Sequence, residues 1–435
     1  MHAKFALPIA LLILIHPFAS LGSSNAEILP DEWVIEDVPF VSQETPYYCS
    51  YASKTMVLNY LGVDVALGEL LFLMGAPFSG GYLLIHGSAV SGRFISLMID
   101  SVEFASSLLG VEYEYWYPSN LTDYWGDYWA RIKENVSEDR PVIVGVDPYY
   151  LPYYSTFNLS EPTGAAHNLV VVGYDGFNAY LLDPYAPFLN QTTGYIAVPI
   201  EDFSNSTDSF IRAYEPMREA FGPTGWALST FSVTGDPTPK PGRIESALMR
   251  NMGRLGGFRI FYPSVPAVNL MTMGVRSTFA LRGNLEITGH LLSFGLSRGI
   301  FEAIRSLLGL YVGIDMLKEQ TLALASYFSE QFYTSVNCSQ LLAGYPSYQG
   351  LSGKMKKISE LYSDCVVLTY QYYLIANETA NETARACQPY TLFREWVDEL
   401  TPVLRELGRT QLSILYIASP ITIPYTSHLF SCMPL

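Results

Sequence analysis

The chain has 435 residues, of which 49% are hydrophobic and 15% are charged, and its formal net charge at pH 7 is −16. This composition excludes a disordered chain, and the length allows two or three domains with sizeable cores. The negative charge argues against a nucleic-acid partner and against binding to an anionic membrane surface.

Residues 1–26 have the pattern of a secretory signal peptide. Lys4 supplies the positive charge, an apolar run extends from Phe5 to Phe18, and small residues up to Ala26 offer cleavage sites. An uncleaved anchor is the weaker alternative, because the run is short for a membrane span of ~20 residues. Export is also favoured by eight Asn-x-Ser/Thr sequons, which are Asn120, Asn135, Asn158, Asn190, Asn205, Asn337, Asn377 and Asn381. We therefore expect a secreted or cell-surface glycoprotein without a stable membrane span after signal removal.

The cysteines are distributed unevenly along the chain. Four of the five lie in the C-terminal part, namely Cys338, Cys365, Cys387 and Cys432. In an exported protein this even set predicts two disulfides, with three pairings open. Cys49 is then the odd thiol, which is either a buried structural cysteine or a reactive one.

Residues 27–233 show the patterns of an α+β domain. A strand-like apolar run ends at Gln43, Pro46 favours a turn, and a helix is predicted to begin at Cys49 and to end at Gly62. Apolar periodicity predicts further helices over 67–74, 91–109 and 125–135, and strands over 111–117, 141–147, 167–175, 178–183 and 226–233. A turn at Asp175 would join two of these strands into a hairpin, with His167 and Asp183 at the same end.

Aromatic residues are dense between positions 113 and 129. They include Tyr113, Tyr115, Trp116, Tyr117, Tyr124, Trp125, Tyr128 and Trp129. The density is compatible with a groove for peptide or sugar, but packing inside the domain is the favoured interpretation.

A proline-rich stretch over 234–242 is predicted to be a linker. After it the apolar period becomes helical, and amphipathic helices are expected over 244–252, 285–308, 316–332, 354–376 and 392–407. Residues 243–435 are therefore predicted to form an all-α domain, whose role the sequence leaves open.

Cys49, His167 and Asp183 have the residue types of a thiol-dependent acyl-transfer site. A cysteine on the first turn of a helix is favoured as a thiolate by the helix dipole. In such a site His167 would accept the thiol proton and Asp183 would orient the imidazole. The side chain of Gln43 and the backbone N–H of Cys49 would stabilise the oxyanion. Each residue alone is weak evidence, so the prediction rests on their joint occurrence.

The same segments resemble a known group of enzymes. The matching residues are Val38-Pro39-Phe40, Gln43, Cys49, Ala52-Ser53, Met56, Asn59-Tyr60 and Gly62, followed by His167 before Val-Val-Val-Gly-Tyr-Asp and by Asp183-Pro184. This pattern resembles the bacteriocin-processing cysteine peptidases (family thirty-nine) and their stand-alone relatives. The resemblance covers about residues 38–231, and it implies a papain-like fold and cleavage of peptide bonds, often after a double glycine.

A second resemblance covers residues 141–183, with Asp147, Tyr149-Tyr150-Leu151-Pro152 and Tyr153 among them. This segment is similar to the N-terminal domain of the butirosin-biosynthesis acyltransferase. Members of that group transfer an acyl group from a cysteine to an amine and often carry a helical C-terminal domain.

One departure from the peptidase pattern keeps an alternative open. The peptidases usually have Gly-Pro after the cysteine, whereas this chain has Ser50-Tyr51. A catalytically inactive papain-fold module that binds extracellular peptide or glycan is therefore the alternative to an enzyme. Such a module predicts that Cys49 is buried or that His167 lies out of reach of its sulfur.

These observations together predict an α+β papain-like domain followed by a helical domain. The expected activity is hydrolysis of a peptide or amide bond, with acyl transfer to an amine as a further alternative. No cofactor is implied. No metal site is expected, because the histidines outside the signal peptide form no ligand-spaced pair, these being His86, His167, His290 and His428. The substrate and the oligomeric state are not fixed by the sequence.

Overall fold

The structure is a computed structural model. It describes residues 29–43, 48–83, 92–93, 99–157, 167–191, 193–221, 227–252, 257–263, 284–290 and 314–381, together with Thr45, Pro162 and helical positions between 395 and 414. The predicted signal peptide, Asn158, Cys387 and Cys432 lie outside the described residues.

A seven-stranded antiparallel sheet forms the centre of the N-terminal part. Its order is β4-β9-β5-β6-β7-β8, and β1 pairs with the far end of β6. The strands are β1 (Trp33–Val34), β4 (Val111–Trp116), β5 (Val142–Val146), β6 (His167–Tyr174), β7 (Asn178–Leu182), β8 (Ile196–Pro199) and β9 (Leu228–Val233). The predicted hairpin around Asp175 is confirmed as β6 and β7.

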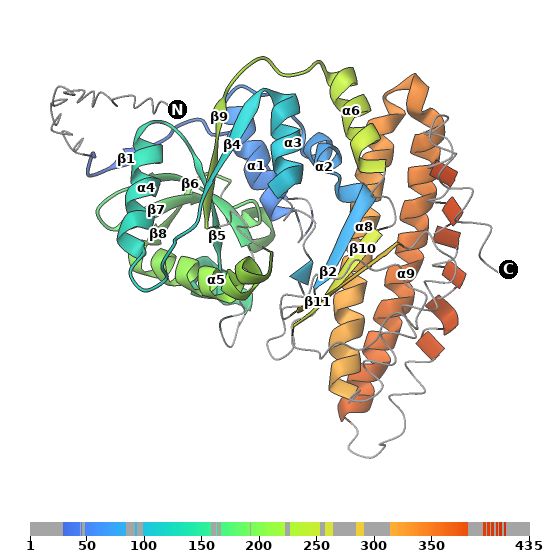
Figure 1. Cartoon of the computed structure of the whole chain (residues 1–435). Helices are drawn as coiled ribbons and strands as arrows, with labels where there is room; N and C mark the ends of the chain where they lie inside the picture. Colours follow the sequence, from blue (N-terminus) through green and yellow to red (C-terminus); the bar gives the residue numbers. More distant parts are fainter. Residues whose placement is uncertain are drawn as a thin grey trace, which may run out of the picture.

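Helices cover both faces of this sheet (Figure 1). Helix α1 (Cys49–Tyr60) packs on β5, β6 and β9. Helix α4 (Trp125–Ser137) packs on β5 and β6, and helix α5 (Ile200–Phe221) packs on β5, β7 and β8. Gly145 marks the α5 face, since a Cβ there would lie 2.1 Å from the ring of Phe210. Because side chains alternate along a strand, Val146 and its register partner His167 point to the opposite face, towards α1.

The aromatic residues around Trp125 belong to the packing between α4 and α5. Trp125 and Trp129 are stacked with ring centroids 5.8 Å apart, and both meet the ring of Phe203 edge to face. Tyr128 is fully buried and donates a hydrogen bond to Ala227 O. Packing, the favoured interpretation of these residues, fits this arrangement better than a binding groove.

The C-terminal part is helical, as predicted, but it also contributes strands. Helices α6 (Lys240–Met252), α8 (Ile314–Ala343) and α9 (Gln349–Asn381) lie within or overlap the predicted ranges, and α8 and α9 run side by side (Figure 1). Residues Asn284–His290, at the start of a predicted helix, instead form β11. Their apolar and polar residues alternate, a period that fits a strand better than a helix.

Strand β11 belongs to a four-stranded sheet built from both parts of the chain. Its order is β11-β10-β2-β3, with β10 (Gly257–Pro263) parallel to β2 (Ser79–Leu83) and β3 (Gly92–Arg93) at the edge. Helix α2 (Leu67–Leu73) and the 3-10 turn η1 (Ala76–Phe78) precede β2 in the chain. This one sheet therefore takes two strands from the chain before the predicted linker and two from the chain after it. Helix α6 begins at Lys240, inside the range predicted to be the linker.

A buried carboxylate also joins the two parts. Glu69 of α2 is fully buried and forms ion pairs with Lys240, at 2.9 Å, and with Arg243, at 3.3 Å, on α6. Two cations on one buried carboxylate offset its desolvation cost. These ion pairs fix α6 against α2, the helix that follows α1.

Two sequence predictions are wrong in detail. The run from Val38 to Gln43 is not a strand, since Asp37 has a φ of 61° and Pro39 has no N–H for a ladder. The helix predicted from residue 91 begins at Ile99 as α3 (Ile99–Leu109), after β3. The C-terminal cap of α1 is as predicted, with Gly62 at a φ of 81°.

The prediction of two disulfides is also wrong. Cys338 and Cys365 are free thiols buried in the α8–α9 pair, which also includes the 3-10 turn η6 (Pro346–Tyr348). There they fill the role of small apolar core residues, and burial raises the pKa of both thiols.

Among the helices that the structure describes, none has both the length and the apolar character to span a membrane.

Candidate functional site

Cys49 is the first residue of α1 and a free thiol. The residue before it, Tyr48, makes no side-chain cap, so the first backbone N–H groups of the helix are left to other acceptors. Cys49 is 9% exposed, compared with 1% for Cys338 and 0% for Cys365. The helix N-terminus therefore presents a cysteine where the dipole and the backbone N–H groups of the first turn favour a negative charge.

His167 and Asp183 meet this cysteine from the hairpin. His167 begins β6, and Asp183 follows the last residue of β7. The Nε2 atom of His167 lies 2.7 Å from Oδ1 of Asp183, and a hydrogen bond joins the imidazole to the Cys49 thiol. Because Nε2 is engaged by the carboxylate, Nδ1 is the ring atom left for the sulfur. The structure thus brings together the three residues that the sequence singled out.

The electrostatics of these groups favour a thiolate–imidazolium pair. Burial raises the pKa of the Cys49 thiol, but the hydrogen bond to His167, the imidazolium charge and backbone hydrogen bonds outweigh it, so the pKa lies below its ordinary value. Burial lowers the pKa of His167, but the Asp183 carboxylate and the Cys49 sulfur raise it to about 10. The same imidazolium holds the pKa of Asp183 below its usual range, against the effect of burial.

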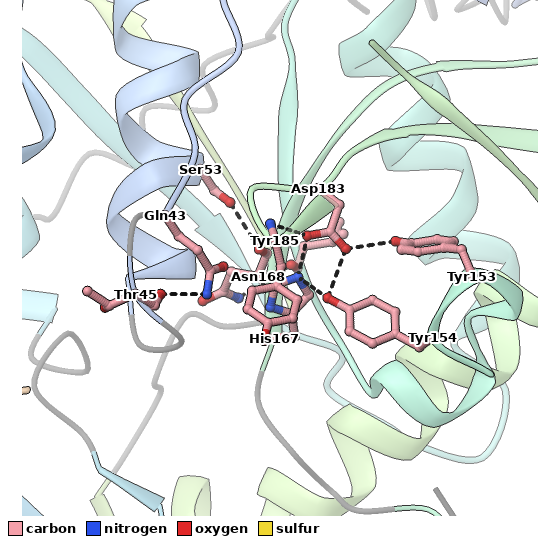
Figure 2. Close-up of polar contacts among 10 residues, drawn as sticks. Gln43, Thr45, Ser53, Tyr153, Tyr154, His167, Asn168, Asp183 and Tyr185 are labelled. Carbon is pink, nitrogen blue, oxygen red and sulfur yellow. Dashed lines mark hydrogen bonds and ion pairs between the residues drawn. The ribbon is translucent and has the colours of Figure 1, made fainter. Parts of the chain in front are cut away.

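Two tyrosines complete the surroundings of the carboxylate (Figure 2). Tyr153 and Tyr154 donate hydrogen bonds to Oδ2 of Asp183 at 2.9 and 3.1 Å, and the Tyr154 hydroxyl also lies 3.2 Å from Nε2 of His167. The backbone N–H of Tyr185 donates to Oδ1 at 2.7 Å. Asp183 is thereby fully buried with four hydrogen-bond partners, and its rotation is fixed.

The sequence alone did not indicate a role for these two tyrosines in the site. They lie on η3 (Pro152–Phe157), which follows η2 (Pro148–Tyr150) after β5. Asp147, at the end of β5, anchors this segment by accepting hydrogen bonds from Tyr149 N at 3.1 Å and from Ser209 Oγ at 2.8 Å. The sequence pattern that could have indicated them is an Asp-Pro pair followed by a run of tyrosines directly after a buried strand. Such a pattern places several hydroxyl groups at one edge of the sheet.

Helix α1 is held against β6 beside the site. The Oγ atom of Ser53 donates to the backbone carbonyl of Asn168 at 3.1 Å. Since Asn168 follows His167, this bond fixes the helix that carries the sulfur relative to the strand that carries the imidazole (Figure 2).

Gln43 lies at the site, but its side chain is partly engaged. Its backbone N–H donates to Pro184 O at 3.1 Å, directly after Asp183, and its Nε2 donates to Thr45 O at 2.7 Å. An amide nitrogen carries two hydrogens, so one N–H remains for another acceptor. Its Oε1 is buried and has no hydrogen-bond partner among the described residues.

Aromatic rings border the imidazole on the hairpin side. Tyr185 stacks on Tyr154 and on Phe188 of η4 (Ala186–Leu189), with centroids 6.2 and 4.8 Å apart. Phe188 is 48% exposed and Phe157, which contacts both tyrosine rings, is 47% exposed. An apolar surface therefore begins beside His167.

The described residues contain no group of three His, Cys, Asp or Glu side chains that could hold a metal ion.

The chain was compared with curated proteins and with models of protein families. No curated protein matches the chain. The model of the Peptidase_C39 like family matches residues 35–219, the part that contains α1, strands β4 to β8 of the main sheet and all four predicted site residues. The predicted resemblance and the α+β papain-like fold are confirmed, and residues 35–219 form a papain-like cysteine peptidase domain of the C39 type.

Proposed function

We propose that the protein is a thiol-dependent hydrolase of peptide or amide bonds, with Cys49, His167 and Asp183 as its catalytic residues. One observation carries the proposal. A cysteine on the first turn of a helix is hydrogen-bonded to an imidazole whose other nitrogen lies 2.7 Å from a buried carboxylate. This arrangement provides a nucleophile, a proton carrier and an orienting group.

The reaction follows from these contacts. The Cys49 thiolate attacks the carbonyl carbon of the substrate, and a C–S bond forms while the carbonyl oxygen becomes negative. Collapse of this intermediate breaks the C–N bond, and His167 gives its Nδ1 proton to the leaving amine. A water then attacks the thioester, His167 takes one of its protons, and the carboxylic acid leaves as Cys49 returns to thiolate.

The oxyanion would be stabilised by the backbone N–H of Cys49 and the remaining side-chain N–H of Gln43. Donors of this kind act in a water-poor site, where they contribute most to the rate. The surroundings of Gln43 support this role, since the residue is 1% exposed and is anchored to Pro184 beside the catalytic carboxylate.

Alkylation of the native protein by iodoacetamide across pH, read by mass spectrometry, tests the proposal. We expect selective modification of Cys49 with a midpoint well below the ~8.5 of a free thiol. Cys338 and Cys365 serve as internal controls, because burial raises their pKa and leaves their thiols protonated. An unmodified Cys49 in the folded protein would refute the enzyme proposal.

A binding module without catalysis is the second candidate. It is favoured by the low exposure of Cys49 and by Ser50-Tyr51 at the positions where the peptidases usually have Gly-Pro. The other criterion for such a module is not met, because His167 is within hydrogen-bond reach of the sulfur.

Acyl transfer to an amine is the alternative to hydrolysis. If the thiolate attacks substrate but an added amine replaces water as the acceptor, product analysis by mass spectrometry will show an amide instead of an acid.

We also propose that the protein is exported and glycosylated. Three sequon asparagines, Asn120, Asn190 and Asn205, are exposed, while three others are half-buried within helices, namely Asn135, Asn337 and Asn377. A fall in mass after endoglycosidase digestion of the exported protein is the expected result, and an unchanged mass contradicts it.

The exposed rings beside His167 predict a preference for substrates with an apolar residue near the scissile bond. Phe188→Ala is expected to raise KM for such peptides by up to about tenfold, because it removes one stacking surface, with little effect on kcat. Phe177→Ala is the matched control, since Phe177 is 82% exposed at the turn, the end of the hairpin away from His167. An equal effect of both substitutions, or none from Phe188→Ala, rules out this subsite.

A further inference from the structure

Lys54 is a buried lysine one turn after the start of α1. Its side chain is 5% exposed, and its ammonium contacts Ser50, 3.4 Å from the backbone carbonyl and in close contact with the hydroxyl. The side chain therefore turns back towards the N-terminus of the helix and places its charge at the level of the first turn.

The neighbouring elements supply no carboxylate for this charge. Strands β5 and β9 carry no titratable side chain, and β6 carries His167 and Tyr174. On α2 the carboxylate of Glu69 is held by Lys240 and Arg243. Among the described residues Lys54 forms no ion pair, although a buried ammonium is costly when unpaired.

In the proposed mechanism the Cys49 thiolate is an anion that interacts with this ammonium. Ser50, which holds the ammonium, directly follows Cys49, and the charges of Lys54 and Cys49 interact. Two further titratable groups face the sulfur, namely His167 through a hydrogen bond and Tyr154 through its charge when ionised. Of these groups, only Lys54 and His167 can carry a positive charge, and Lys54 carries it without taking part in the proton transfer.

We propose that Lys54 is a positioning residue that stabilises the Cys49 thiolate, with Ser50 holding its ammonium at the first turn of α1. The proposal rests on the proposed function in one respect, which is that Cys49 acts as a thiolate. It adds a second cation to the imidazolium, and it assigns a purpose to Ser50, the residue at which the chain departs from the Gly-Pro pattern.

The protonation of Lys54 agrees with this role. Burial lowers the pKa of its ammonium to about 8, and the negative charge of Cys49 opposes that effect. At neutral pH the ammonium is therefore still mostly charged. A thiolate that loses this neighbour requires a higher pH to form, so removal of the charge shifts thiol ionisation upward.

The test is the pH profile of Cys49 alkylation by iodoacetamide in the full chain. Lys54→Met and Lys54→Gln remove the charge, and the second keeps a donor for Ser50. Both are expected to raise the midpoint by about one pH unit, because an ion pair at a few ångströms contributes on that scale at a partly buried site. Lys54→Arg should restore the midpoint to near the wild-type value. Lys357→Met is the matched control, since Lys357 is half exposed on α9 and its loss changes the net charge equally.

The outcomes separate this proposal from the enzyme proposal. A reactive wild-type Cys49 whose midpoint stays the same in a folded Lys54→Gln or Lys54→Met overturns the role of Lys54 alone. A midpoint that rises equally in Lys54→Arg overturns it too, because packing and not charge is then responsible. An unreactive Cys49 in the wild type overturns the enzyme proposal and this one together. Far-UV circular dichroism and the melting temperature verify that each variant is folded, and Lys54→Gln carries the test if Lys54→Met does not fold.

Discussion

Cys49→Ala is expected to reduce hydrolysis of a quenched fluorescent peptide library by about 10⁴-fold or more. The substitution removes the nucleophile, and neither the imidazole nor the oxyanion donors can form the acyl-enzyme without it. Its effect on the free energy of unfolding should be small, since a cysteine and an alanine differ little in volume and the site is at the edge of the core. Steady-state kinetics and thermal unfolding of the same preparations provide the two measurements.

Cys365→Ala is the control for this substitution. Cys365 is likewise a buried free thiol, but it lies on α9, and no described contact joins it to the proposed catalytic groups. It should keep the wild-type rate. Activity that survives Cys49→Ala at more than a few per cent of the wild-type rate would exclude thiol catalysis, whereas a wild type without any hydrolysis would favour the binding module.

The sequence predicted several of the elements that carry the candidate site, because local rules determine most of them. Helix α1 begins at Cys49, where the sequence predicted it, and its end is set by Gly62, whose φ of 81° suits glycine. The hairpin between β6 and β7 follows from alternation and from the turn at Asp175, and its antiparallel register brings His167 and Asp183 to the same end.

The parts that the sequence did not predict depend on contacts between distant segments. The hydrogen bonds of Tyr153 and Tyr154 to Asp183 join residues about thirty positions apart, and a run of tyrosines does not reveal its acceptor. The sheet that pairs β2 with β10 joins segments on either side of the linker, and no local pattern announces it. The disulfide prediction was wrong for a similar reason, since an even count of cysteines carries no information on which thiols lie inside a helical pair.

Asp183→Ala is expected to lower the rate constant for hydrolysis by about 10³-fold and to destabilise the fold. The variant leaves the hydroxyls of Tyr153 and Tyr154 and the N–H of Tyr185 without their acceptor, at a cost of about 2–4 kcal/mol in the free energy of unfolding. Kinetics and thermal unfolding measure the two effects.

The pH dependence separates the charge of Asp183 from its hydrogen bonds. In the wild type the carboxylate raises the pKa of His167 to about 10, so the alkaline limit of the reactive thiolate–imidazolium pair lies near that pH. In both Asp183→Ala and Asp183→Asn this limit should move to lower pH, because neither side chain is charged. Asp183→Asn should lose less activity and less stability, because its carbonyl still accepts the Nε2 proton of the imidazole.

The stability effect should itself depend on pH, with a sign that follows from the pKa of Asp183. Folding lowers that pKa, so the charged carboxylate stabilises the fold above its unfolded pKa of ~3.9 and loses this contribution as the pH falls through the folded value. The difference in melting temperature between the wild type and Asp183→Ala should therefore be large at neutral pH and shrink in acid. A difference that is constant from neutral to acidic pH would mean that the carboxylate is neutral in the fold, and the imidazole would then lack the partner on which its proton transfer depends.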